Sequence, residues 1–201
     1  MNTGVTTNET TDQDLVTRAL EGDQDSFAIL VERHQQAVYN LTYRMLRNAR
    51  EAEDAAQEAF LRAYQHLNRY DPSRSFKTWL MSIASNHCID RIRKRRLTWL
   101  SIDEPLPPHP ALNSNAPAPE AAAVASEASA AMQDLLDELA PEYRAAVILR
   151  YWYDLSYTEI AESLDTTESA IKSRLYRARQ MLADRIQGGA APELSVAMEG
   201  A

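Results

Sequence analysis

The sequence predicts an all-α protein made of two small helical domains joined by a flexible linker. Apolar residues recur at spacings of three and four along most of the chain, which is the period of a helix. Good helix formers dominate, and the chain has only five glycines. Most of the nine prolines lie in residues 103–128, among Ala, Ser and Asn. Because that stretch buries too little apolar surface to fold, we interpret it as the linker.

The linker divides the chain into a longer first domain and a shorter second domain. The amino-terminal residues are rich in Thr and Asn, and the last residues return to Gly, Ala and Pro, so both ends are expected to be loose. The boundaries are a disordered N-terminus over 1–13, a first domain over 14–98, a linker over 99–128, a second domain over 129–186 and a tail over 187–201.

Four helices are predicted in the first domain. Their expected positions are 14–21, ending before Gly22, then a helix that follows Asp25-Ser26 and extends to Leu46, and helices over about 50–67 and 76–96. The middle of the last helix, Ser85–Cys88, is polar and poor in helix formers, which favours an interruption there.

The second domain contains the clearest local motif, within helices expected near 129–139, 142–153, 157–164 and 168–186. Ser156 and Glu159 have the spacing of a capping box at a helix start. Asp165 and Thr166 form a tight break, and Thr167 can cap the following helix. The two helices have apolar inner stripes, formed by Ile160, Ala161 and Leu164 and by Ala170, Ile171, Leu175, Ala178 and Leu182. This pattern is typical of a helix-turn-helix whose second helix enters the major groove of DNA.

The outward faces of this second helix carry candidate DNA contacts. Arginine can bind guanine edges through two hydrogen bonds, while Lys, Ser and Tyr suit phosphates. An ordinary helical hairpin with a solvated basic face is the alternative. The candidates are Lys172, Ser173, Arg174, Tyr176, Arg177 and Arg179.

Two charged surfaces are predicted in the first domain. Asp54, Gln57 and Glu58 share one helix face, which is either a docking surface for a basic partner or a plain solvated face. The fourth helix combines aromatic residues with a basic run, a combination that suits single-stranded DNA. Its alternative is a basic helix end that complements the helix dipole. The basic run consists of Arg91, Arg93, Lys94, Arg95 and Arg96.

Composition excludes several classes of function. The net charge of −8, taken as an average, argues against binding of nucleic acid. The charges are segregated along the chain, however, so one surface can bind DNA and another a protein. The sequence has no Gly-rich phosphate loop, nucleophile elbow or paired carboxylates in a plausible cleft, so we expect no enzyme, no catalytic residue and no small-molecule substrate.

Cysteine usage and hydropathy indicate where the protein is expected to act, which is a reducing compartment. Cys88 is the only cysteine, so an internal disulfide is impossible. No Cys/His cluster has metal-ligand spacing, and we expect neither a metal nor a cofactor. The sequence shows no signal peptide and no apolar run long enough to span a bilayer, so the cytoplasm is the simplest location.

Three segments together resemble the extracytoplasmic-function (ECF) sigma factors, a class within the sigma-70 superfamily. Residues 53–60 resemble the family's core-binding helix, and residues 76–86 with 90–96 resemble its −10 helices. Residues 155–161 with 171–179 resemble its −35 reader. The resemblance therefore implies a sigma-2-like first domain and a sigma-4-like second domain. Asp165 stands where the family usually has Gly in the helix-turn-helix turn.

The resemblance also implies roles for the candidate residues. Asp54, Gln57 and Glu58 would meet core RNA polymerase, and Asn86 with the basic helix after it would hold a flipped-out base of the −10 element. The outward residues of the last helix would face the −35 element. The implied partners are core RNA polymerase, promoter DNA and an anti-sigma factor, which in this family is often membrane-bound.

Other classes of function remain as alternatives to a sigma factor. A stand-alone helix-turn-helix regulator would share the second domain, but it would not need the Asp54, Gln57 and Glu58 face and would be expected to dimerise on a palindrome. A structural helical adaptor would not need two separate basic surfaces.

Overall fold

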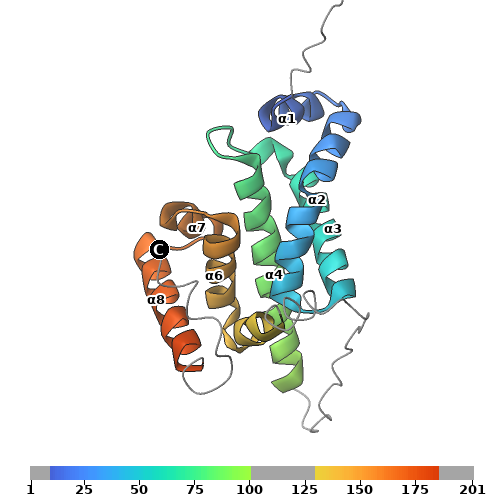
Figure 1. Cartoon of the computed structure of the whole chain (residues 1–201). Helices are drawn as coiled ribbons and strands as arrows, with labels where there is room; N and C mark the ends of the chain where they lie inside the picture. The colour runs from blue at the N-terminus through green and yellow to red at the C-terminus, as the bar shows by residue number, and fades with distance from the viewer. Residues whose placement is uncertain (1–9, 101–129, 186–201) are drawn as a thin grey trace, which may run out of the picture.

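The computed structural model describes residues 10–100 and 130–185. Within these ranges all regular secondary structure is helical, which confirms the predicted fold class (Figure 1). Most of the predicted linker and the whole predicted tail lie outside the described residues.

The first half of the chain is a bundle of long helices. α2, α3 and α4 pack side by side, and α1 contacts α2 at one end of the bundle (Figure 1). Alanines on the inner face of α3, including Ala52, Ala55, Ala59 and Ala63, are fully buried and let the neighbouring helices approach closely. The elements are α1 (Asp12–Leu20), α2 (Gln24–Leu46), α3 (Ala49–Gln65), a 3-10 turn (Leu67–Arg69) and α4 (Phe76–Leu100).

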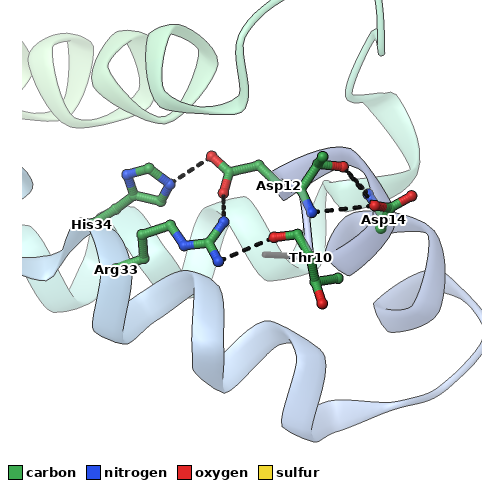
Figure 2. Close-up of polar contacts among 6 residues, drawn as sticks. Thr10, Asp12, Asp14, Arg33 and His34 are labelled. Atoms are coloured by element: carbon green, nitrogen blue, oxygen red, sulfur yellow. Dashed lines mark hydrogen bonds and ion pairs between the residues drawn. The ribbon is translucent and has the colours of Figure 1, made fainter. Parts of the chain in front are cut away.

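The first helix begins at Asp12, two residues earlier than the sequence predicted. The cause is a capping box, in which Thr11 and Asp14 satisfy each other's free backbone donors. Asp12 then ties α1 to α2: its carboxylate lies 2.8 Å from His34 Nε2 and 2.5 Å from Arg33 Nη1 (Figure 2). Residues 12 and 13 therefore belong to the folded bundle, although they were expected in the disordered N-terminus.

The predicted interruption of the fourth helix is wrong, because α4 runs unbroken from Phe76 to Leu100. Ser85 and Cys88 are fully buried against the bundle, so tertiary packing outweighs the weak helix propensity of this segment. Burial also raises the pKa of the Cys88 thiol to about 12, which makes it unreactive at neutral pH.

The second half contains the helix-turn-helix. Its inner stripes are buried as predicted, except that Ala170 is half-buried. A helix over residues 130–138 is followed by α6 (Pro141–Tyr153), α7 (Tyr157–Ser163) and α8 (Glu168–Arg185).

The two halves pack against each other. α6 contacts both α2 and α4, and α7 contacts α4 (Figure 1). Arg144, which is buried, donates hydrogen bonds from Nη1 to the Met45 carbonyl oxygen at 2.6 Å and from Nη2 to the Asp137 carbonyl oxygen at 2.8 Å. A buried guanidinium therefore connects the 130–138 helix to the end of α2, a contact that joins two domains expected to be separate.

Candidate polymerase and nucleic-acid interfaces

The acidic face of α3 is open to solvent. Asp54 and Gln57 are exposed, and Glu58 is half-buried and accepts a 2.7 Å hydrogen bond from Arg62 Nε one turn later. This ion pair lowers the pKa of Glu58, so its carboxylate remains charged at neutral pH. The predicted trio is thus brought together on one face, although one of its charges is already partly neutralised.

A hollow between α2 and α3 lies beside this face. Gln57 lines it together with Glu53, Tyr39 and Phe60. Sequence analysis did not select Tyr39 or Glu53 as site residues, although the i, i+4 spacing from Glu53 to Gln57 was readable in the sequence. Polar groups surrounding apolar ones in a hollow form a surface suited to another protein's helix.

The basic residues of α4 follow one another along its second half. Arg93, Lys94 and Arg95 are exposed and Arg91 is half-buried, whereas the side chain of Arg96 is outside the described ones. Arg91, Lys94 and Arg95 line a hollow with Glu51, whose carboxylate lies 3.7 Å from Arg95. Positive charge gathers here as predicted, with Glu51 of α3 beside it.

The second half of the chain contacts the DNA face predicted for α4. Asn86 Nδ2 donates a 2.9 Å hydrogen bond to the carbonyl oxygen of Ser163, at the end of α7. Arg93 Nη2 lies 2.5 Å from the Glu142 carboxylate of α6. Asn86 and Arg93, both predicted −10 residues, therefore contact the second half of the chain.

Two further contacts extend the same interface along α4. Arg74, just before α4, lies 3.4 Å from the Glu162 carboxylate, and the Lys77 ammonium lies 5.6 Å from the ring centre of Tyr153. Sequence reasoning missed these partners because each is more than 70 residues away along the chain. The opposite charges of Arg74 and Glu162 were a signal for one of the two contacts.

The turn of the helix-turn-helix has the geometry that the sequence predicted. Ser156 and Glu159 form the capping box, and Thr167 Oγ1 accepts a hydrogen bond from the backbone N–H of Ala170 at 3.2 Å. Asp165 adopts a left-handed conformation with φ of 47°, at the position where Gly was expected. Aspartate tolerates this conformation better than most residues do, so the turn closes without glycine.

All six predicted −35 residues are on α8, but they differ in exposure and in partners. Lys172, Ser173, Tyr176 and Arg177 are exposed, whereas Arg174 and Arg179 are half-buried. The six project from the same helix around its buried stripe, and Arg177 Nη1 donates a 3.4 Å hydrogen bond to the Tyr143 hydroxyl of α6.

An acidic residue missed by sequence analysis lies at the start of α8. Glu168 binds Lys172 Nζ at 2.7 Å and accepts a 3.2 Å hydrogen bond from Thr158 Oγ1 of α7. These contacts lower the pKa of Glu168 and raise that of Lys172, so both groups are charged at neutral pH. The spacing of four between Glu168 and Lys172 was a readable signal.

Comparison with known proteins decides between the classes of function left open by the sequence. The profile of Sigma-70 region 2 matches residues 30–98, and that of Sigma-70 region 4 matches residues 129–182. The chain is 38% identical over 172 residues to the ECF RNA polymerase sigma factor SigW of Bacillus subtilis, across 83% of this chain and 92% of the relative. The chain belongs to the ECF sigma factors. The family predicted from the three motifs is therefore confirmed, and a stand-alone regulator is not favoured.

Other relatives support the same family. The ECF RNA polymerase sigma-E factor of Escherichia coli K12 is 33% identical over 185 residues, across 88% of this chain and 95% of the relative. The solved structure of CnrH in complex with the cytosolic domain of CnrY aligns with a TM-score of 0.62 and 27% identity, covering 89% of this chain and 98% of the other. A structure of the sigma factor RpoE with the anti-sigma factor NepR from Bartonella quintana shares the fold, with a TM-score of 0.59 and 23% identity over 80% of this chain and 96% of the other.

Residues 10–100 and 130–185 contain no cluster of His, Cys, Asp and Glu able to hold a metal ion. No helix in these ranges is both long enough and apolar enough to cross a bilayer.

Proposed function

We propose that this sigma factor directs core RNA polymerase to promoters through three separate surfaces of the chain. In this proposal the α3 face with Asp54, Gln57 and Glu58 binds core polymerase. The α4 face with Asn86 and the basic run binds the −10 element. The outer face of α8 binds the −35 element. The first half of the chain thus corresponds to the sigma-2-like domain and the second half to the sigma-4-like domain.

The observation that carries this proposal is the separation of charge between neighbouring helices. Most of the exposed charged groups on α3 are carboxylates, while most of those on α4 and α8 are guanidinium and ammonium groups. Phosphate contacts by Lys and Arg supply most of the salt-dependent attraction of a protein to DNA. An acidic face next to a basic one suits a chain that holds a protein with one surface and DNA with the other.

The −10 assignment rests on Asn86 and the basic residues that follow it. A flipped base has its polar edge free, and an asparagine amide can both donate to and accept from that edge. Arg91, Arg93 and Lys94 follow within two turns of α4, where they can reach the adjoining phosphates.

The proposed setting is the cytoplasm, where the polymerase acts, and the proposed role is that of a non-catalytic subunit. An anti-sigma factor is a proposed partner, because the RpoE structure that shares this fold contains one.

The proposed function is tested by reconstituting core RNA polymerase with the chain and sequencing the genomic fragments it retains. We expect the fragments to share two short sequence elements at a fixed separation, and core polymerase alone to retain no such set. Variants with Lys172→Ala or Arg174→Ala identify the upstream element. Its enrichment among the retained fragments should fall in these variants, while enrichment of the downstream element should persist. Retention of fragments with one palindromic element by the chain without polymerase would contradict the proposal.

A further inference from the structure

A carboxylate lies at the end of α8 that a recognition helix presents to DNA. In helix-turn-helix proteins the N-terminal residues of the recognition helix contact the base edges. Glu168 is the first residue of α8, and its side chain is 45% exposed. The charged residues that follow it over the next turns of the helix are basic, namely Lys172, Arg174, Arg177 and Arg179.

Both oxygens of this carboxylate are held in place by the helix-turn-helix itself. Oε1 lies 2.7 Å from Lys172 Nζ, one turn along α8, and Oε2 accepts a 3.2 Å hydrogen bond from Thr158 Oγ1. Thr158 belongs to α7, which packs against α8 (Figure 1). The contacts with Lys172 and Thr158 lower the pKa of Glu168, so at neutral pH the carboxylate is ionised and can only accept hydrogen bonds. An ionised carboxylate has room for about four hydrogen bonds, so Glu168 can accept others from the solvent side.

A fixed acceptor at this end of α8 favours some bases over others. A carboxylate repels the phosphates of every DNA sequence, and the acceptors of guanine and thymine in the major groove also repel it. Cytosine offers the opposite, because its N4 amino group is a donor in that groove, and Glu is one of the side chains that accept from it.

The partner of Glu168 matches the other half of the same base pair. A lysine ammonium donates to guanine O6 and N7. Guanine O6 and cytosine N4 are hydrogen-bonded to each other in the base pair, just as the Lys172 and Glu168 groups are in contact at 2.7 Å. An A·T pair also presents a donor beside an acceptor, but thymine gives the ammonium one acceptor and a methyl group where guanine gives two acceptors.

We propose that Glu168 and Lys172 together read one G·C base pair of the −35 element. In this arrangement Lys172 Nζ donates to the guanine, Glu168 accepts from the cytosine N4 amino group, and Thr158 keeps the carboxylate oriented. The inference rests on the proposed function of α8, and it adds Glu168 as a specificity-determining residue.

Base reading by Glu168 has a signature that its other effects lack. A carboxylate in the first turn stabilises a helix through the helix dipole, and an i, i+4 ion pair adds to that stability. Both of these effects, and the repulsion of phosphates, are the same for every DNA sequence. A change in preference at a single base pair therefore reports base reading.

The test uses core RNA polymerase reconstituted with the full chain, and duplex promoters that differ at one base pair of the upstream element and share the downstream element. Glu168→Gln removes the charge but keeps the length of the side chain and an oxygen that can accept from Thr158. Lys172→Met removes the ammonium and keeps an unbranched stem. The matched control is Asp184→Asn, which removes the same charge from an exposed residue at the other end of α8. Selection of the downstream element shows that each variant is folded and docked.

We expect the wild type to prefer G·C at one position by roughly tenfold. Glu168→Gln and Lys172→Met should both lower the preference at that same position. Glutamine binds adenine through two hydrogen bonds, so Glu168→Gln should also raise the tolerance for adenine in place of the cytosine. Asp184→Asn should keep the wild-type preferences. The inference is overturned if Glu168→Gln behaves like this control, or if the Glu168 and Lys172 variants alter different positions.

The two proposals fail in different ways. If Lys172→Met and Arg174→Ala weaken selection of the upstream element while Glu168→Gln keeps the wild-type preferences, base reading by Glu168 is disproved and the proposed function stands. If the wild-type complex selects no upstream element at all, the −35 assignment of α8 fails and the reading of a G·C pair fails with it.

Discussion

The side-chain amide of Asn86 donates a 2.9 Å hydrogen bond to the main-chain carbonyl oxygen of Ser163, 77 residues later in the chain. One residue is the proposed reader of a −10 base, and the other ends the first helix of the helix-turn-helix. The residue assigned to DNA therefore also contributes to contact between the two halves.

Asn86→Ala separates these two roles. In complex with core polymerase, it should erode the base preference at one −10 position more than the overall affinity, because amides read base edges whereas arginines supply the salt-dependent attraction. The loss of discrimination should be about 1–3 kcal/mol, measured with oligonucleotides that differ at that base. A uniform loss across all sequences would remove Asn86 from base reading.

Asp54→Lys should weaken binding to core polymerase while leaving the helix content unchanged. Asp54 is exposed on α3, so the substitution reverses a charge at the docking face without disturbing the core. Glu58→Lys also breaks the ion pair with Arg62, and the double variant should lose several kcal/mol of binding free energy to core polymerase. A pull-down with core polymerase measures it, with Glu21→Lys on the exposed end of α1 as the control. Unchanged affinity in the Asp54 and Glu58 variants would place the interface elsewhere.

Arg174→Ala and Arg177→Ala test the outer face of α8. If the substituted arginine reads a base, the free energy of DNA binding should fall by about 1–3 kcal/mol, and the sequence preference at one −35 position should relax. A variant that loses only a phosphate contact should weaken binding evenly across sequences and reduce the salt dependence. Arg174 is half-buried whereas Arg177 is exposed, so the two are expected to differ. Full promoter activity in both variants would refute the assignment of this helix.

The capping box before α7 predicts a pH dependence of stability. Hydrogen bonds from the Ser156 side chain and backbone lower the pKa of Glu159 below its ordinary 4.5. The folded state therefore gains stability from the ionised carboxylate above pH 4.5, and loses it as the pH falls through the lower folded pKa. Glu159→Gln should reduce the free energy of unfolding at pH 7. The difference in the free energy of unfolding between this variant and the wild type should shrink as the pH falls. Ser156→Ala should lower the free energy of unfolding by about 1 kcal/mol at neutral pH. Urea unfolding at several pH values measures both, and a gap that widens in acid would contradict this role.

Local sequence patterns predicted those features that depend on neighbours along the chain. The helix stripes, the Ser156–Glu159 capping box and the turn at Asp165 each follow from spacing or from the conformational range of one residue. The continuity of α4 was mispredicted because burial of Ser85 and Cys88 is a tertiary effect that propensity does not register.

The contacts between the halves could not be predicted from local patterns. Arg144 looks like any charged helix residue in the sequence, and only the approach of α2 makes it a buried donor to Met45. Glu142 and Glu162 are likewise ordinary surface acids until α4 lies beside them. The candidate residues themselves were readable, but their engagement within the chain required the fold.

The most direct test of the central claim is strand selection by the complex of the full chain with core RNA polymerase. A sigma factor helps to open DNA, so the complex should bind a non-template-strand −10 oligonucleotide much better than its complement. The basic run of α4 supplies attraction to either strand, and only base-specific contacts such as that of Asn86 distinguish them. We predict strong preference for the non-template strand, and a loss of that preference in Asn86→Ala. Equal binding of both strands by the wild-type complex would contradict the account, even if the second half bound duplex −35 DNA.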